Sequence, residues 1–99
     1  MAMSAEFDAT RAWQKSRSVA LRPEPFGALV YSFSTRKLSF LKSKLLVSVV
    51  EALGDHPDAA AALTACGVSE QQRPAYVKAL ADLARSQMIE QRIETEESP

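Results

Sequence analysis

The chain has 99 residues, of which 12 are basic, 12 acidic and 46% hydrophobic, so it is electrically neutral with room for a single hydrophobic core. This length excludes a multidomain enzyme and leaves little space for a large buried active site. The single cysteine excludes an internal disulfide, and the longest apolar run, residues 45–50, is far below the roughly 20 residues of a membrane-spanning helix. We therefore expect a cytoplasmic domain with no membrane segment.

The neutral total conceals an uneven distribution of charge. Residues 18–44 carry five cations and one carboxylate. Residues 45–66 carry three carboxylates and no cation, and residues 93–99 carry three more carboxylates. One early segment of the chain is therefore basic.

Both ends of the chain have little hydrophobic patterning. We expect residues 1–12 to form a flexible N-terminus and residues 93–99 a flexible acidic tail, which leaves one folded domain at residues 13–92. Trp13, the only tryptophan, could face a partner or anchor the entering segment on the sheet, and we expect the anchoring role.

Residues 18–41 alternate with a period of two, which predicts three short β-strands. Residues 23–27 separate the first two strands, because their prolines cannot donate to a strand ladder and their glycine tolerates positive φ. Residues 34–36 form a tight turn before the third strand. The pattern predicts a three-stranded antiparallel meander.

At Ser43 the hydrophobic period changes to that of a helix. The first predicted helix has Ser43 as its N-cap and ends at Gly54. A second, rich in alanine, begins near Pro57, a residue suited to the first helical turn, and ends at Gly67.

The third predicted helix begins at Ser69, which forms a Ser-x-x-Gln capping box with Gln72. Pro74 lies inside this helix and predicts a kink or a loosened first turn. The resulting order β-β-β-α-α-α indicates an α+β domain with a winged helix-turn-helix-like arrangement.

Side chains suited to catalysis or metal binding are scarce. His56 lies in a helix-terminating turn, and Cys66 on the alanine-rich helix is expected to be a small buried hydrophobe. These two are fewer than the four ligands of a structural zinc site, and dispersed Gly27, Gly54 and Gly67 form no phosphate-binding loop. We expect no catalytic residue, no metal and no cofactor.

The second and third helices also resemble a helix-turn-helix, so DNA binding is the alternative function. The predicted third helix carries Arg73, Lys78 and Arg85 against Glu70 and Asp82. Strong DNA binding relies on about 6–10 phosphate contacts. This net positive charge is small for that role, and we expect no nucleic-acid partner.

The predicted third strand, within residues 36–42, is a better candidate for binding. If it is an exposed edge, its free N–H and C=O groups can accept another chain as an added strand. Its flanking cations could equally protect an open edge from aggregation. Composition leaves both interpretations open.

Four segments resemble one known family, the peptide chaperones of mycofactocin biosynthesis, which are related to the chaperone of pyrroloquinoline quinone biosynthesis. These segments are residues 19–31, 35–43, 53–57 and 72–76, and the resemblance extends over residues 13–90. The first segment contains the uninterrupted run Leu-Arg-Pro-Glu-Pro-Phe-Gly-Ala-Leu.

The resemblance implies a RiPP recognition element, a non-enzymatic winged fold that binds the leader of a ribosomally made precursor peptide. Such a domain presents the peptide to a radical S-adenosylmethionine (SAM) maturase. The leader is implied to add as a strand against the third strand, in a groove beside the third helix. The implied peptide-binding residues are Arg36, Lys37, Leu38, Ser39, Phe40, Leu41, Lys42, Tyr76, Leu80 and Leu83.

Precursors of the mycofactocin type tend to be acidic, and the basic segment of this chain carries the third strand. We expect Leu38→Asp and Leu41→Asp to weaken peptide binding. We also expect Leu38→Asp to lower stability, because the alternation of the strand places Leu38 toward the core.

Overall fold

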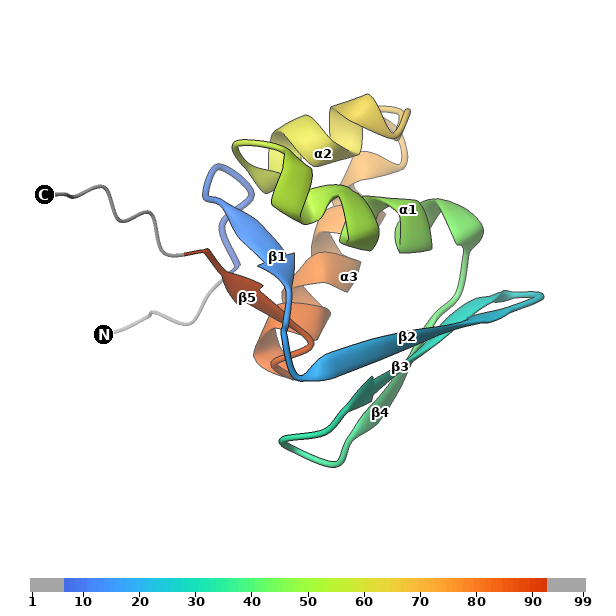
Figure 1. Cartoon of the computed structure of the whole chain (residues 1–99). Helices are drawn as coiled ribbons and strands as arrows, with labels where there is room; N and C mark the ends of the chain where they lie inside the picture. The colour runs from blue at the N-terminus through green and yellow to red at the C-terminus, as the bar shows by residue number, and fades with distance from the viewer. Residues whose placement is uncertain (1–6, 93–99) are drawn as a thin grey trace, which may run out of the picture.

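The computed structural model describes residues 7–92, so residues 1–6 and the predicted tail at 93–99 lie outside the described part. The three helices lie on one side of a three-stranded sheet, with the first helix directly against the sheet and the second beyond the first, and a second, two-stranded sheet lies beside them (Figure 1). The elements are β1 (Trp13–Lys15), β2 (Val19–Glu24), β3 (Gly27–Ser32), β4 (Leu38–Leu41), α1 (Lys44–Ala52), the 3₁₀ turn η1 (Leu53–Asp55), α2 (Ala59–Ala65), α3 (Arg73–Arg85) and β5 (Ile89–Gln91).

The three-stranded sheet has the antiparallel order β2-β3-β4, which confirms the predicted meander. Leu29 of β3 lies opposite Phe40 of β4, and Val30 lies opposite Ser39. Within residues 7–92, β4 pairs with β3 alone, so its other side is an open edge.

The turn between β2 and β3 brings Gly27 against the end of β4. Gly27 has φ +156°, and a Cβ at this position would lie 2.0 Å from the carbonyl oxygen of Leu41. Only glycine fits here without moving the backbone of one of the two strands.

We expect Gly27→Ala to lower the free energy of unfolding by about 1–3 kcal/mol, because it adds backbone strain and a clash with a main-chain atom. Urea denaturation measures the loss. Gly54→Ala is the control, since the nearest atom to its added Cβ would be 3.8 Å away, on Gln14. Equal stability of the two variants would contradict the prediction.

The first two helices begin where side chains cap them. The Oγ of Ser43 accepts a hydrogen bond from the backbone N–H of Leu46 at 3.0 Å, which confirms the predicted N-cap of α1. For α2 the cap is the carboxylate of Asp58, which accepts from the N–H of Ala61 at 2.8 Å. That helix therefore starts just after Pro57.

The third helix begins later than predicted. The capping-box bonds do form, since the N–H of Ser69 donates to Oε1 of Gln72 at 3.1 Å and the N–H of Gln72 donates to Oγ of Ser69 at 3.2 Å. They close a turn that precedes α3, and the helix starts at Arg73. Pro74 therefore lies in the first helical turn, where its missing N–H has no partner to lose. Of the two predicted effects, the structure shows the loosened first turn, since the residues after Ser69 form a turn and not α-helix.

The two-stranded sheet was not predicted. In it β1 and β5 pair antiparallel, with Trp13 opposite Gln91 and Lys15 opposite Ile89. The observed order of elements therefore has one strand before and one strand after the predicted β-β-β-α-α-α series. Each of these strands is three residues long, which is too short for a period of two to be recognised.

Trp13 anchors the N-terminal segment, as predicted. Its side chain is buried, its indole Nε1 donates to the carbonyl oxygen of Asp8 at 2.8 Å, and its ring lies 4.8 Å from that of Phe7. The side chain and backbone N–H of Thr10 donate to the Asp8 carboxylate, and these bonds hold the pKa of Asp8 below its usual value. Phe7, Asp8 and Thr10 of the N-terminal segment therefore lie against Trp13 or brace the residues that contact it.

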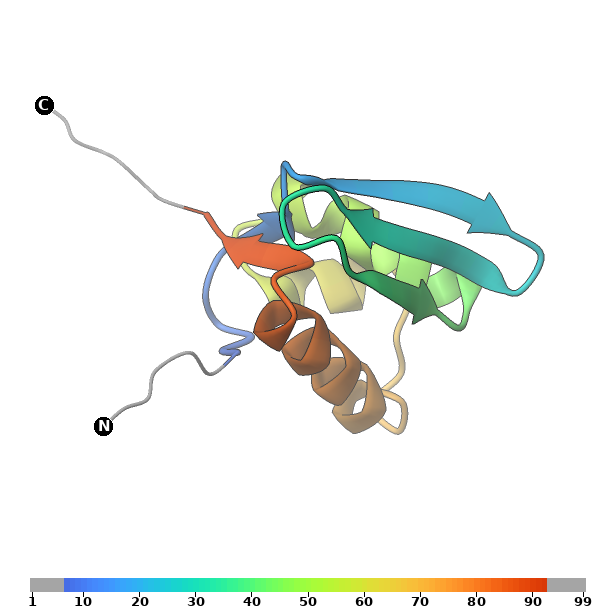
Figure 2. The same ribbon diagram turned by 90° about the horizontal axis from the view of Figure 1, so that it is seen from below.

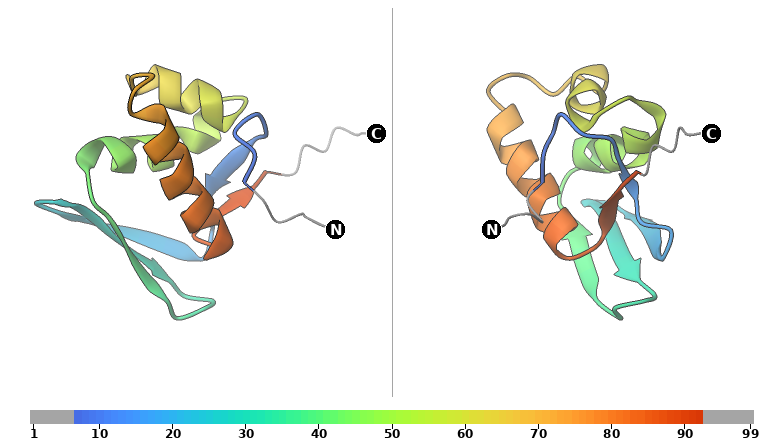
Figure 3. Two further views of the ribbon diagram at one scale, coloured as in Figure 1. Left: turned by 180° about the vertical axis from the view of Figure 1, so that it is seen from behind. Right: turned by 90° about the vertical axis from the view of Figure 1, so that its left-hand side faces the viewer.

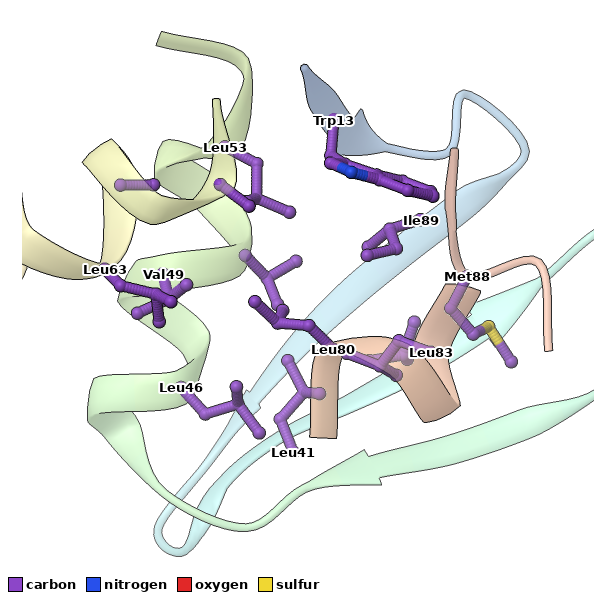
Figure 4. Packing of buried hydrophobic residues seen from close by; sticks show 14 of the residues in the cluster. Trp13, Leu41, Leu46, Val49, Leu53, Leu63, Leu80, Leu83, Met88 and Ile89 are labelled. Carbon is purple, nitrogen blue, oxygen red and sulfur yellow. The ribbon is translucent and has the colours of Figure 1, made fainter. Parts of the chain in front are cut away.

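The hydrophobic core lies between the helices and the inner face of the sheet. Figure 4 shows Leu41 of β4 near Leu46 of α1 and Leu80 of α3, and Leu41 and Leu80 are fully buried. The inward side chain of Leu41 therefore packs β4 against α1 and α3.

Over residues 7–92, no helix has both the length and the apolar character that crossing a membrane requires.

Candidate functional site

The open edge of β4 presents main-chain groups at alternate residues. The N–H of Ser32 donates to the carbonyl oxygen of Lys37 at 2.9 Å, so these opposite residues form a hydrogen-bonded pair. Such pairs alternate with non-bonded pairs along an antiparallel ladder. Ser39 therefore bonds to β3, whereas the N–H and C=O groups of Leu38 and Phe40 point toward the open edge.

A groove of about 300 Å³ lies between β4 and α3. Figures 2 and 3 show α3 running alongside the sheet near β4, which is the sheet edge closer to this helix. Buried Leu41 and Leu83 contribute apolar surface to the groove, while Lys42 and Asp82 are exposed at its border. The remaining lining residues are Ser39, Phe40, Leu46, Ala79 and Ser86.

The side chains of β4 divide between the two faces of the sheet. Leu41 is fully buried, whereas Leu38 and Phe40 are each 54% exposed. Leu38 lies opposite Tyr31 on the outer face, so the prediction that it points toward the core is wrong. Ser39 and Leu41 instead point to the inner face of the sheet, because they lie opposite Val30 and Ala28, which are both buried.

The three residues of α3 implied by the resemblance have different environments. Leu83 lines the groove, but Leu80 is fully buried in the core and is absent from the groove lining. Tyr76 is half-buried, and its hydroxyl is 3.0 Å from Oγ of Ser43, which ties α3 to the start of α1. Leu80 and Tyr76 therefore support the walls of the groove without lining it.

Three residues on the α3 side of the groove were not singled out as binding residues from the sequence. They are Ala79 and Asp82 of α3 and Ser86, the residue that caps its end, which with Leu83 follow the i, i+3, i+4, i+7 spacing of one helix face. This spacing was present in the sequence, but the face combines small and acidic residues and does not stand out as hydrophobic.

The cations around β4 keep their charge available. Arg36 and Lys37 are exposed in the turn before β4, and Lys42 is exposed immediately after it. None of the three forms an ion pair with a carboxylate between residues 7 and 92. The edge is therefore bordered by positive charge that an anionic ligand could neutralise.

His56 and Cys66 occupy structural positions. His56 follows η1, and its carbonyl oxygen accepts from Nη2 of Arg92, while Cys66 ends α2 and donates its N–H to the carbonyl oxygen of Ala62 at 3.0 Å. Among residues 7–92, no three His, Cys, Asp or Glu side chains gather in a way that could hold a metal ion.

An open strand edge beside an apolar groove, bordered by unpaired cations, is a surface suited to an extended acidic chain. These features define a small α+β protein with an open, positively bordered strand edge beside an apolar groove. Residues 12–90 match the peptide chaperone MftB family, and the chain belongs to this family. The resemblance noted from the sequence is thereby confirmed.

Curated relatives agree with the family match. The chain is 53% identical over 83 residues to the peptide chaperone MftB of Mycolicibacterium smegmatis, covering 84% of this chain and 81% of that protein. It is 51% identical to the protein of the same name from Mycobacterium ulcerans, covering 84% and 76%. For the Mycobacterium tuberculosis protein the identity is 49%, covering 87% and 79%. No solved structure matches the chain.

Proposed function

We propose that this protein binds the leader of an acidic precursor peptide of mycofactocin biosynthesis by strand addition along β4. In this proposal it is a cytoplasmic RiPP recognition element of winged-helix type. It presents the bound peptide to a radical SAM maturase, which carries out the chemistry. The observation that carries the proposal is the open edge of β4 beside the groove of α3.

Main-chain pairing supplies the general part of the affinity. Leu38 and Phe40 each have an outward N–H donor and an outward C=O acceptor, with which an added strand can form backbone hydrogen bonds. Alternate side chains of that strand would point into the groove toward Leu41 and Leu83, which selects apolar residues at those positions.

The groove helps to decide between the two possible roles of the cations that flank β4, which are protection of the edge from aggregation and attraction of a ligand. An edge that is only protected needs charge and no adjoining cavity. Here an apolar groove of about 300 Å³ adjoins the edge, and Lys42 borders it. This combination favours ligand binding as the role of the basic segment.

The side chains of α3 count against the DNA-binding alternative. The guanidinium of Arg73 donates to Oγ1 of Thr64 at 2.8 Å, and Lys78 and Arg85 both pair with Asp82. The helix thus has three cations against one carboxylate, which is few for the roughly 6–10 phosphate contacts of a strong DNA binder. Measurements with duplex DNA at two salt concentrations test this alternative, which predicts steeply salt-dependent affinity.

Calorimetry with the acidic precursor peptide tests the proposal directly. We expect an interaction with one peptide per chain. Absence of binding at high micromolar peptide would refute the proposed function.

We expect Lys42→Glu to weaken peptide binding by about tenfold at low salt, because it places a like charge at the border of the groove. High salt should reduce the difference between variant and wild type. Arg11→Glu is the control, since exposed Arg11 lies in the segment before β1, outside the groove lining. Equal effects of the two variants at low salt would place the peptide elsewhere.

A further inference from the structure

The outer face of the three-stranded sheet carries an apolar surface that no described element covers. Figure 2 shows this face turned toward the viewer, with the helices behind the sheet or beside it. All the exposed large hydrophobic side chains of residues 7–92 lie in β3, β4 or the turns that adjoin them. They are Phe26, Phe33, Leu38 and Phe40, with exposures of 46%, 61%, 54% and 54%.

These side chains form a connected patch, which we call the outer aromatic face and define as Phe26, Tyr31, Phe33, Leu38 and Phe40. The rings of Phe26 and Phe40 lie 6.1 Å apart, and those of Tyr31 and Phe33 lie 5.3 Å apart, both edge to face. Leu38 lies opposite Tyr31 and two residues before Phe40 on the same face of β4, so it is placed between the two pairs. Clustered exposed aromatic residues mark interaction surfaces.

The charges around this face restrict its partner. Arg22 shares the outer face, because it lies opposite Leu29, which in turn lies opposite Phe40. Arg36 and Lys37 are exposed in the adjoining turn, and residues 18–44 contain a single carboxylate, which pairs with Arg22. A second copy of this chain would bring like charges together, so the face fits a protein whose apolar surface is bordered by carboxylates.

We propose that the outer aromatic face is the docking surface for the maturase, which rests on the proposed function. Strand addition along β4 would extend the sheet, and alternate side chains of the bound peptide would emerge on the outer face beside Leu38 and Phe40. The maturase would then contact chaperone and peptide on one continuous surface. Peptide and maturase therefore bind with positive coupling, and each strengthens the binding of the other.

The test compares two binding reactions of one variant of the full chain. In Phe26→Ser/Phe33→Ser, the changed residues lie outside the groove lining and outside β4. We expect it to bind the purified radical SAM maturase at least about tenfold more weakly than wild type, while its affinity for the precursor peptide is unchanged. Phe33→Leu keeps an apolar side chain and should retain maturase binding. Biolayer interferometry with and without the peptide measures both reactions.

Each outcome is decisive. Wild-type maturase binding that tightens with peptide and is lost in the double variant supports the proposal. Unchanged maturase binding by the folded double variant overturns it, and so does a wild-type homodimer that the double variant dissociates in sedimentation experiments. If wild type fails to bind the peptide, the proposed function fails, while dependence of peptide-free maturase binding on Phe26 and Phe33 would still support the docking surface.

Discussion

Phe40→Pro should weaken binding of the precursor peptide by about tenfold more than Phe40→Ala does. Both variants remove the exposed ring, but only proline also removes the N–H that points toward the open edge. Losing one hydrogen bond and leaving its partner unsatisfied costs about 1–3 kcal/mol, and 1.4 kcal/mol corresponds to a factor of ten in affinity. Calorimetry of the two variants with the same peptide isolates the backbone contribution.

Folding should survive this proline. The N–H of Phe40 has no partner in β3, because Ser39 makes the ladder bonds on that side of the strand. Proline is tolerated on edge strands at positions whose N–H faces outward. Circular dichroism verifies the fold, and Leu38→Pro against Leu38→Ala repeats the comparison two residues earlier. Equal peptide affinities within both pairs would exclude strand addition along β4.

Elements with a local sequence signal were predicted well. The meander was recognised from alternation and from its turns, and α1 from its period and from Ser43, whose side chain makes the expected cap. The start of α3 was misplaced because the same Ser69 and Gln72 bonds can close a turn as well as a helix. A capping box specifies local hydrogen bonds and leaves the following backbone free to differ.

The small sheet could not be predicted because its signal is not local. The strands β1 and β5 are three residues long and lie at opposite ends of the domain. What holds them together is tertiary, including the burial of Trp13 and Ile89 and the bond from Nε2 of Gln14 to the carboxylate of Glu90 at 2.8 Å. No period in either segment encodes these contacts.

For the candidate site, the sequence identified the strand but not the direction of its side chains. Leu38, Phe40 and Leu41 are all hydrophobic, so alternation alone cannot decide which face of β4 is buried. The sheet register decides it, since Leu41 lies opposite Ala28 on the inner face and Phe40 lies opposite Leu29 on the outer face. The hydrophobic residues of the outer face are exposed, and they belong to the docking surface that we propose, so the usual pattern of burial is reversed there.

Because Leu41 is a buried residue of the inner face, its substitution is expected to affect the stability of the domain. We expect Leu41→Ala to lower the free energy of unfolding by about 2–5 kcal/mol, because the side chain is fully buried and its removal leaves a cavity between β4, α1 and α3. Domains of this size have a total stability of roughly 5–15 kcal/mol. The loss is therefore a large fraction of the whole, and urea denaturation measures it.

Phe40→Ala is the matched control, because the neighbouring residue is half-exposed on the opposite face and should cost well under half as much stability. Leu41→Asp adds an unpaired carboxylate to the same buried position, so we expect it to unfold the domain and to lose peptide binding for that reason. Peptide binding lost in Leu41→Asp therefore cannot locate the groove, whereas loss in folded Lys42→Glu or Phe40→Pro can. Similar stability of Leu41→Ala and Phe40→Ala would contradict this description of β4. The buried and exposed faces of the strand, and the residues whose N–H and C=O groups point to the open edge, would then have to be assigned again.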